Sequence, residues 1–211
     1  MMTLLYKEIR LCVHPTSIVF AFLGCLVLVP AYPYSVIFLF GCLAPYITFV
    51  NARETNDAWY TAVLPVTKRE SVRAKCLLIV SLQLFQLLFS IPFTLLRRAL
   101  GVPNNPVGLD ATLAWYGFGL MIYAAFDLAF FPAFYKSGYK AGKAFIVASV
   151  PMLLGMIAAE STAHIPALAW LDSDTHWRRQ LPVLAAGMAC YASLLPLACR
   201  ISEGRFERVD L

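Results

Sequence analysis

CLLIVSLQLFQLLFSIPFTLL, residues 76–96, is a stretch of 21 residues without a single charged side chain. A membrane-spanning α-helix needs about 20 mostly apolar residues, so this stretch predicts one. The composition agrees, because 60% of the 211 residues are hydrophobic and 14% are charged, whereas a soluble domain carries about 25% charged residues. Too little polar surface remains to face water. We therefore interpret the chain as an integral membrane protein.

Five further apolar segments approach the length of a membrane span. The first two are separated by only a few residues that include Pro30 and Pro33, which predicts a helical hairpin. The expected fold class is an all-α integral membrane protein with six transmembrane helices in one domain, residues 1–211. The predicted spans are about 15–31, 34–50, 76–96, 111–132, 144–161 and 180–200.

The first fourteen residues predict an amphipathic helix that lies in the membrane interface. Leu5, Ile9 and Cys12 would share one helical face, while Lys7 and Arg10 point elsewhere. A plain lead-in to the first span is an equally good interpretation of this segment.

Lysine and arginine counts predict the orientation, because cytoplasmic loops are enriched in both residues. Of the 17 basic residues, 13 fall on the side of the six predicted spans that holds both termini. The other four are Arg97, Arg98, Arg178 and Arg179. We therefore expect a multi-pass protein of the cell's inner or plasma membrane with both termini in the cytoplasm.

LPVTKRESVRAK, residues 64–75, directly precedes the opening stretch and belongs to the largest predicted cytoplasmic loop. Its basic residues are Lys68, Arg69, Arg73 and Lys75. Holding the loop in the cytoplasm is by itself a sufficient reason for this charge. The local pattern suggests more, because Pro65 would end any preceding helix, and Thr67 with Glu70 fits a capping box. We expect a helix to begin there and to continue into the span.

An apolar patch too short to cross a membrane lies just upstream in the same loop. Its residues are Trp59, Tyr60, Val63 and Leu64. Together with the basic residues that follow, this patch predicts a short cytoplasmic elbow with an aromatic face and a charged face, which we interpret as a docking surface.

Signatures of catalysis and of cofactor binding are missing. GYKAGKA, residues 138–144, has three residues between its glycines, where a phosphate-binding loop needs four, and Ala144 follows the lysine in place of Ser or Thr. The six cysteines form no C-x-x-C pair, so they are interpreted as small buried hydrophobic residues. We expect no enzymatic activity, no cofactor in this chain and no nucleic-acid binding.

A group of acidic and histidine residues lies on the predicted outer side, and it consists of Glu160, His164, Asp172, Asp174 and His176. Glu160 and His164 are four residues apart, so they could share a helix face and a metal ion. A hydrated loop beside the end of a helix is the favoured interpretation, and no metal is expected.

Asp127 is the only acidic residue well inside a predicted span. A charge in the membrane is costly and usually faces a cavity or a partner. A role in a substrate path and a structural hydrogen bond to another helix are both open.

ETNDAWYTAVLPVTKRESVRAKCL, residues 54–77, resembles the first cytoplasmic loop of type-2 ABC exporter permeases, and more narrowly that of compact six-helix permeases whose ATPase is a separate chain. In these, an acidic residue and Asn precede an aromatic residue, and Leu-Pro-Val-Ser/Thr-Arg, Val and Lys follow. The matching residues are Glu54, Asn56, Trp59, Leu64, Pro65, Val66, Thr67, Val72 and Lys75. Lys68 replaces the usual arginine. Residues 130–144 and 199–211 are similar to the second cytoplasmic loop and the charged tail of the same family.

The resemblance implies a division of labour. The permease forms the membrane path for an amphipathic substrate, a peptide in the narrower group, while a separate cytosolic ATPase binds ATP and Mg²⁺. Two permease subunits, identical or different, would work with two ATPase subunits in the lipid membrane. The residues implied in ATPase coupling are Glu54, Asp57, Trp59, Leu64, Pro65, Thr67, Lys68, Arg69, Glu70 and Arg73, with Lys136 and Lys140 in the second loop.

The alternative is a membrane protein that works without an ATPase, either a secondary transporter or an immunity or scaffold protein. Against a secondary transporter, only one acidic residue lies deep in a span, and the two halves of the chain show no evident repeat. A neighbouring gene for an ATP-binding cassette protein would favour the exporter.

Overall fold

The structure is a computed structural model that describes residues 2–208, apart from the side chain of Ala58. Within these residues it is all-helical, which confirms the predicted fold class. The last three residues of the charged tail, 209–211, lie outside the described residues. The elements are α1 (Met2–Leu11), α2 (Pro15–Phe22), the 3₁₀ helix η1 (Leu23–Leu28), α3 (Ser35–Glu54), α4 (Asp57–Val63), α5 (Lys68–Ala99), α6 (Leu113–Lys136), α7 (Ala141–Ala163), the 3₁₀ helices η2 (Pro166–Leu171) and η3 (Asp174–His176), and α8 (Trp177–Glu207).

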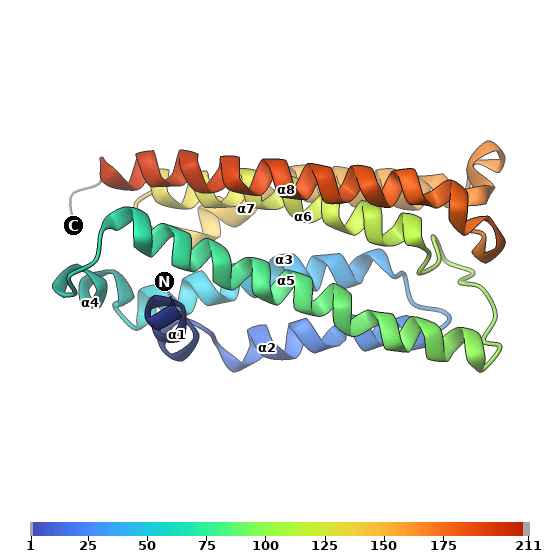
Figure 1. Ribbon diagram of the computed structural model, residues 1–211, viewed down its shortest axis with the longest axis horizontal. Helices are drawn as coiled ribbons and strands as arrows, with labels where there is room; N and C mark the ends of the chain where they lie inside the picture. Colours follow the sequence, from blue (N-terminus) through green and yellow to red (C-terminus); the bar gives the residue numbers. More distant parts are fainter. Residues whose placement is uncertain (1, 209–211) are drawn as a thin grey trace.

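Within the described part of the chain, five helices are long and apolar enough to cross a membrane, namely α3, α5, α6, α7 and α8. The chain is therefore a multi-pass membrane protein. α2 and η1 together extend about 24 Å, somewhat less than the hydrocarbon core of roughly 30 Å. α1 is bent by 100° from this pair and lies across the end of the bundle (Figure 1).

The two ends of the bundle carry different features. Figure 1 shows α1, α4, the start of α5 and the end of α8 at one end of the bundle, which we call the α4 end. The opposite end holds the last residues of α5, with Arg97 and Arg98, and the first residues of α8, with Arg178 and Arg179. The four basic residues that the sequence assigns to the outer side thus share the end away from α4.

α6 forms the centre of the bundle. It packs along α7 and α8 and also contacts α3, with buried side chains on all of its faces. A helix that is apolar all round is expected in such a position. Phe126 stacks on Phe130 with ring centres 5.2 Å apart, and Phe49 of α3 meets Phe134 edge-on at 4.5 Å. These aromatic contacts fill the core near the α4 end.

α6 and α8 approach each other closely where each carries a glycine. A Cβ atom added to Gly117 would lie 2.6 Å from the carbonyl oxygen of Val183, and one added to Gly187 would lie 2.8 Å from the Cα of Gly117. Both distances are shorter than a van der Waals contact. Small residues at such crossings let backbones approach and pack inside a membrane.

Polar side chains between the spanning helices find partners inside the bundle. Gln86 of α5 donates to the carbonyl oxygens of Phe20 (2.9 Å) and Ile37 (3.1 Å) and accepts a hydrogen bond from the Tyr123 hydroxyl. Because water is absent from the hydrocarbon core, such internal partners are needed. Gln86 thereby joins α2, α3, α5 and α6.

α1 packs one of its faces against the bundle. Its buried residues, with the linker that follows, are Leu4, Glu8 and Cys12. Leu5 is half-buried and Ile9 is 48% exposed, so this part of the predicted stripe remains available to the membrane, and the interfacial location of α1 stays a prediction. Glu8 is buried for an electrostatic reason, because its carboxylate pairs with Lys75 of α5.

Candidate functional site

A short helical elbow, residues 55–67, joins α3 to α5 at the α4 end. α3 ends at Glu54, and Asn56 adopts a left-handed backbone conformation (φ 51°) that turns the chain into α4. Asparagine is one of the few residues besides glycine that tolerate this conformation. Pro65 follows the end of α4 and has no N–H with which to continue a helix. Turn chemistry thus explains both the Asn and the Pro of the 54–77 stretch.

Thr67 ends the elbow and caps α5. Thr67 Oγ1 accepts a hydrogen bond from the backbone N–H of Glu70 (3.2 Å), and Glu70 Oε2 accepts one from the backbone N–H of Thr67 (2.9 Å). The predicted capping box is confirmed. The cap fixes where the 32-residue α5, which runs the length of the bundle, begins.

α4 directs its large apolar side chains outward. Trp59 is 72% exposed and Val63 is 70% exposed, and Tyr60 between them is also exposed. The inner face of the same helix carries buried Asp57 and Thr61. An exposed apolar patch on a short helix at the end of a bundle is typical of an interaction surface.

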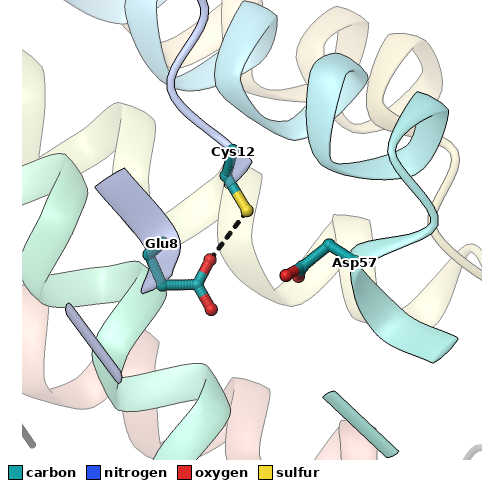
Figure 2. A group of neighbouring side chains, drawn as sticks. All are labelled: Glu8, Cys12 and Asp57. Carbon is teal, nitrogen blue, oxygen red and sulfur yellow. Dashed lines mark hydrogen bonds between the residues drawn. The ribbon is translucent and has the colours of Figure 1, made fainter. Parts of the chain in front are cut away.

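Three buried charged residues, Glu8, Asp57 and Lys75, hold the inner face of α4 together with the partly buried Lys7, and we call these four the charge cluster. Lys7 Nζ lies 2.6 Å from Asp57 Oδ1 and 2.7 Å from Glu8 Oε1. Lys75 Nζ lies 2.6 Å from Glu8 Oε2 and also pairs with Asp57 Oδ2. Figure 2 shows the Glu8 and Asp57 carboxylates facing each other from α1 and α4. The charge cluster therefore ties α1, α4 and α5 together.

The charge cluster is electrically balanced, with two cations and two anions. Burial alone would raise the pKa of the Asp57 carboxyl, but the charge of Lys75 and the hydrogen bonds from both lysines outweigh burial, so the pKa ends below its ordinary value of 3.8. Asp57 therefore stays ionised at neutral pH. A carboxylate with a lowered pKa stabilises the fold above its unfolded pKa, and this contribution is lost only in more acidic solution.

Glu8, Cys12 and Asp57 bring three atoms of metal-ligand type within 4.8 Å of one another (Figure 2). The lysine ammonium groups already bind both carboxylates, and Cys12 Sγ donates to Glu8 Oε2 at 2.9 Å. Burial raises the pKa of the Cys12 thiol far above its ordinary value, so the thiol stays protonated. We interpret the group as part of the ion-pair cluster and not as a metal site.

Lys75 corrects one expectation of the sequence analysis. It was expected at the cytoplasmic surface of α5 with the other basic residues of its stretch, yet it is buried in the charge cluster. Lys75 lies six residues beyond the exposed Arg69 and two beyond the exposed Arg73, on the face of α5 that meets α1. The carboxylates of Glu8 and Asp57 compensate the desolvation of its ammonium group.

The other basic side chains at the start of α5 contact the last turns of α8. The contacts are an Arg69–Glu207 ion pair (2.6 Å), an Arg73–Glu203 ion pair (2.7 Å) and Lys68 Nζ at 5.6 Å from the ring centre of Phe206. Both arginine side chains remain largely exposed, and exposed ion pairs are weakly stabilising. These charges therefore join α5 to α8 and are also reachable from solution.

The turn between α6 and α7, residues 137–140, faces the elbow. A cavity of about 510 Å³ lies between them. Asn56 and Trp59 line it from the elbow, Phe134 lines it from the end of α6, and Tyr139 lines it from the turn. Tyr139 has a left-handed backbone conformation (φ 64°), which is strained for an aromatic residue. Such strain often lies at functional sites, where the surrounding structure maintains it.

The two loops named in the sequence analysis thus come together at one end of the molecule. A second cavity, of about 540 Å³, has Glu54 on one wall and Lys140 on another. Lys136 is exposed at the end of α6, near the same turn, but it does not line either cavity. Asp57 differs from the other expected coupling residues because it is buried, so any role in coupling would consist of positioning α4.

Asp127 lies in the interior of the bundle, away from the elbow. Gln83 Nε2 donates to Asp127 Oδ1 at 3.0 Å, and the Tyr191 hydroxyl donates to Gln83 Oε1 at 2.8 Å. The interhelical hydrogen bond is therefore present, linking α6, α5 and α8. A role in the substrate path stays a prediction.

The polar residues of the opposite end are dispersed among separate partners. Glu160 accepts hydrogen bonds from the backbone N–H groups of Ser35 (3.3 Å) and Leu109 (2.9 Å). Asp172 accepts one from Asp110 N at 2.6 Å, while Asp174 pairs with Arg98. The acidic residues thus fasten loops to the bundle. His164 and His176 are exposed.

Local sequence patterns do not predict the charge cluster as a unit. The available signal was Glu8, the one acidic residue in the first fourteen positions, which lies four residues before Cys12. An acidic residue on the apolar face of a helix becomes buried when that face packs, and a buried carboxylate needs a cation as its partner. Lys75, at the start of a span, is a suitable cation. The pairing itself spans 67 positions, so local patterns could not identify it.

A family described as ABC-2 family transporter protein matches residues 3–177. The match covers α1 through η3 and includes the elbow, the charge cluster and the turn between α6 and α7. Searches among curated proteins and among solved structures return no significant match.

Proposed function

The chain belongs to the ABC-2 family of transporter proteins, and we propose that it is the permease subunit of an exporter driven by a separate cytosolic ABC ATPase. Family membership makes it the membrane subunit of an ABC transporter. The finer proposal, that the elbow receives the motion of an ATPase, is supported by one observation above all. The exposed aromatic face of α4 lies on a helix whose opposite face is fixed to the bundle by buried ion pairs.

In the proposed mechanism, the ATPase binds ATP and Mg²⁺ and contacts Trp59, Tyr60 and Val63 when it closes. Force on α4 reaches α5 by two routes, through the capping box at Thr67 and through Lys75. It reaches α1 through Lys7 and Glu8. Separating buried ion pairs is costly, so α1, α4 and the start of α5 would move as one body.

The turn between α6 and α7 would make a second, smaller contact with the ATPase. Lys136 and Lys140 are exposed there, and Tyr139 lines the cavity beside Trp59. Basic side chains at the rim of a contact favour association with an acidic partner surface. The same ATPase subunit would therefore contact both the elbow and this turn.

The resemblance of the elbow to compact exporter permeases supports a proposal for the substrate and the assembly. We propose an amphipathic substrate of the peptide class, a pair of permease subunits that are identical or different, and two ATPase subunits. The path would lie between the two permease subunits.

The partnership is tested by purification. The isolated chain is expected to show no ATP hydrolysis, because its sequence contains no phosphate-binding loop. When it is co-expressed with its cognate ABC ATPase, the two should co-purify in a fixed ratio and hydrolyse ATP. Robust hydrolysis by the chain alone, or purification of the two proteins as separate species, would overturn the proposal.

The orientation is tested by labelling single cysteines in intact cells, introduced into a variant whose six native cysteines are replaced by serine or alanine. Ser137, in the turn between α6 and α7, and Ser173, between η2 and η3, lie at opposite ends of the bundle. Ser137→Cys should react with an impermeant thiol reagent only after the cells are opened, whereas Ser173→Cys should react from outside. The reverse result would place the elbow outside the cell, where an ATPase could not reach it.

A further inference from the structure

A long apolar groove lies between α5, α6 and α8, toward the end of the bundle away from α4. Its volume is about 300 Å³, and its wall includes Leu88, Ile91 and Leu95 of α5, Leu120 of α6 and Leu184 of α8. The lining positions on α5 extend from 84 to 98, which corresponds to about 21 Å along the helix axis. The groove therefore runs parallel to the spanning helices, as lipid chains do.

The hydroxyl groups beside this groove already have partners. Tyr116 OH lies 2.9 Å from Ser90 Oγ and 3.0 Å from Thr94 Oγ1, within hydrogen-bond distance of both. A water molecule held in a cavity needs several polar partners, and this wall provides few. Leu88 is 64% exposed, so the groove opens on the side of the bundle. In a membrane, the molecule that fills such a space is hydrocarbon.

One end of the groove is basic. Arg98 lines it, and an ion pair connects Arg98 to Asp174, just before α8. The first turn of α8 then presents exposed Arg178 and Arg179 beside exposed Trp177, with the Arg178 guanidinium 5.3 Å from the centre of the Trp177 ring. Tryptophan is enriched where a membrane meets water, and arginine forms paired hydrogen bonds with phosphate.

We propose that this groove binds one acyl chain of an anionic phospholipid, whose phosphate is held by Arg98 and by Arg178 at the start of α8. Arg98 and Asp174 are both nearly half exposed, so their ion pair can open to admit a phosphate without uncovering a buried charge. Lipid binding at this site requires that the chain is inserted in a membrane, but it does not require an ATPase. In the proposed orientation it faces the outer leaflet.

Native mass spectrometry of the purified chain, titrated with dioleoyl phosphatidylglycerol or dioleoyl phosphatidylcholine, tests the proposal. The two lipids have the same chains, so the difference in apparent Kd isolates the headgroup. The wild type should bind phosphatidylglycerol several-fold more tightly. Arg98→Gln and Arg178→Gln should each weaken this binding by about fivefold, since one basic residue near a membrane surface contributes about 1 kcal/mol. They should weaken phosphatidylcholine binding less, because the choline cation offsets the charge of its phosphate.

Ile91→Trp tests the acyl-chain part of the site, because a larger ring fills the groove. It should reduce the binding of both lipids, whereas Leu154→Trp, on an exposed face of α7 outside the groove, should bind like the wild type. Equal affinities of the wild type for the two lipids would contradict the anionic site. Unchanged lipid binding by Ile91→Trp would contradict the groove. The arginine variants test the headgroup contact even if Ile91→Trp does not fold.

Discussion

Lys75→Met is expected to lower the free energy of unfolding by about 3–5 kcal/mol, the usual cost of removing one partner from a buried ion pair. Methionine has nearly the length of lysine, so packing is largely preserved and the loss is mainly electrostatic. The substitution leaves the buried carboxylates of Glu8 and Asp57 with Lys7 as their only partner in the charge cluster. Their mutual repulsion should loosen α1 and α4 from α5.

Denaturant unfolding of the purified protein in detergent micelles measures this effect. Adding Glu8→Gln to Lys75→Met removes one of the two carboxylates and leaves one cation, Lys7, paired with one anion, Asp57. The double variant should therefore recover part of the lost stability. Lys143→Met, at the exposed start of α7, is the matched control and should stay within about 0.5 kcal/mol of the wild type. If Lys75→Met unfolds like the control, the charge cluster does not hold the elbow.

Gly187→Ala is expected to destabilise the protein by about 1–3 kcal/mol or more, because it overpacks the crossing of α6 and α8. The new Cβ atom would meet the backbone of Gly117, which has no flexible side chain to move aside. The two helices would have to separate, and this contact belongs to the most extensive helix pair of the bundle.

Gly204→Ala provides the control within the same helix. Among the described residues, apart from its chain neighbours and the backbone of its own helix, no heavy atom lies within 4 Å of a Cβ added at that position. Alanine favours a helix over glycine by roughly 1 kcal/mol, so this variant should be as stable as the wild type or more stable. The melting temperatures of Gly187→Ala and Gly204→Ala can be compared by thermal unfolding, followed with a thiol-reactive fluorescent dye or by light scattering. Equal melting temperatures would show that the close approach of the two helices does not limit their packing.

Local signals in the sequence were enough to predict the start of α5. Thr67 and Glu70 are three residues apart, and Pro65 excludes a helix that continues from upstream. Each of these effects acts within one helical turn, so no knowledge of the tertiary structure is required. The exposed patch around Trp59 was predictable for the same reason, since a short apolar run beside charged residues cannot cross a membrane.

The pairing of buried charges required the tertiary structure. Glu8 and Lys75 are 67 positions apart, and Lys7 and Asp57 are 50 apart. Hydrophobic periodicity alone treats Glu8 as a surface residue, whereas two lysines make its burial favourable. The same limit applies to Arg69 and Arg73, whose partners on α8 come from the last turns of the chain.

The central claim is that the exposed face of α4 binds an ABC ATPase. The most direct measurement is the affinity of the purified chain for its cognate ATPase after Trp59→Ser and Val63→Ser are introduced together. Both side chains are exposed, so the variant should unfold like the wild type.

Buried aromatic anchors of an interface contribute at least about 2 kcal/mol, so the account predicts a Kd weakened by about 30-fold or more and the loss of substrate-stimulated ATP hydrolysis. Tyr6→Ser, which removes an exposed aromatic residue of α1, should leave the affinity unchanged. A doubly substituted α4 that binds the ATPase as tightly as the wild type would contradict the account.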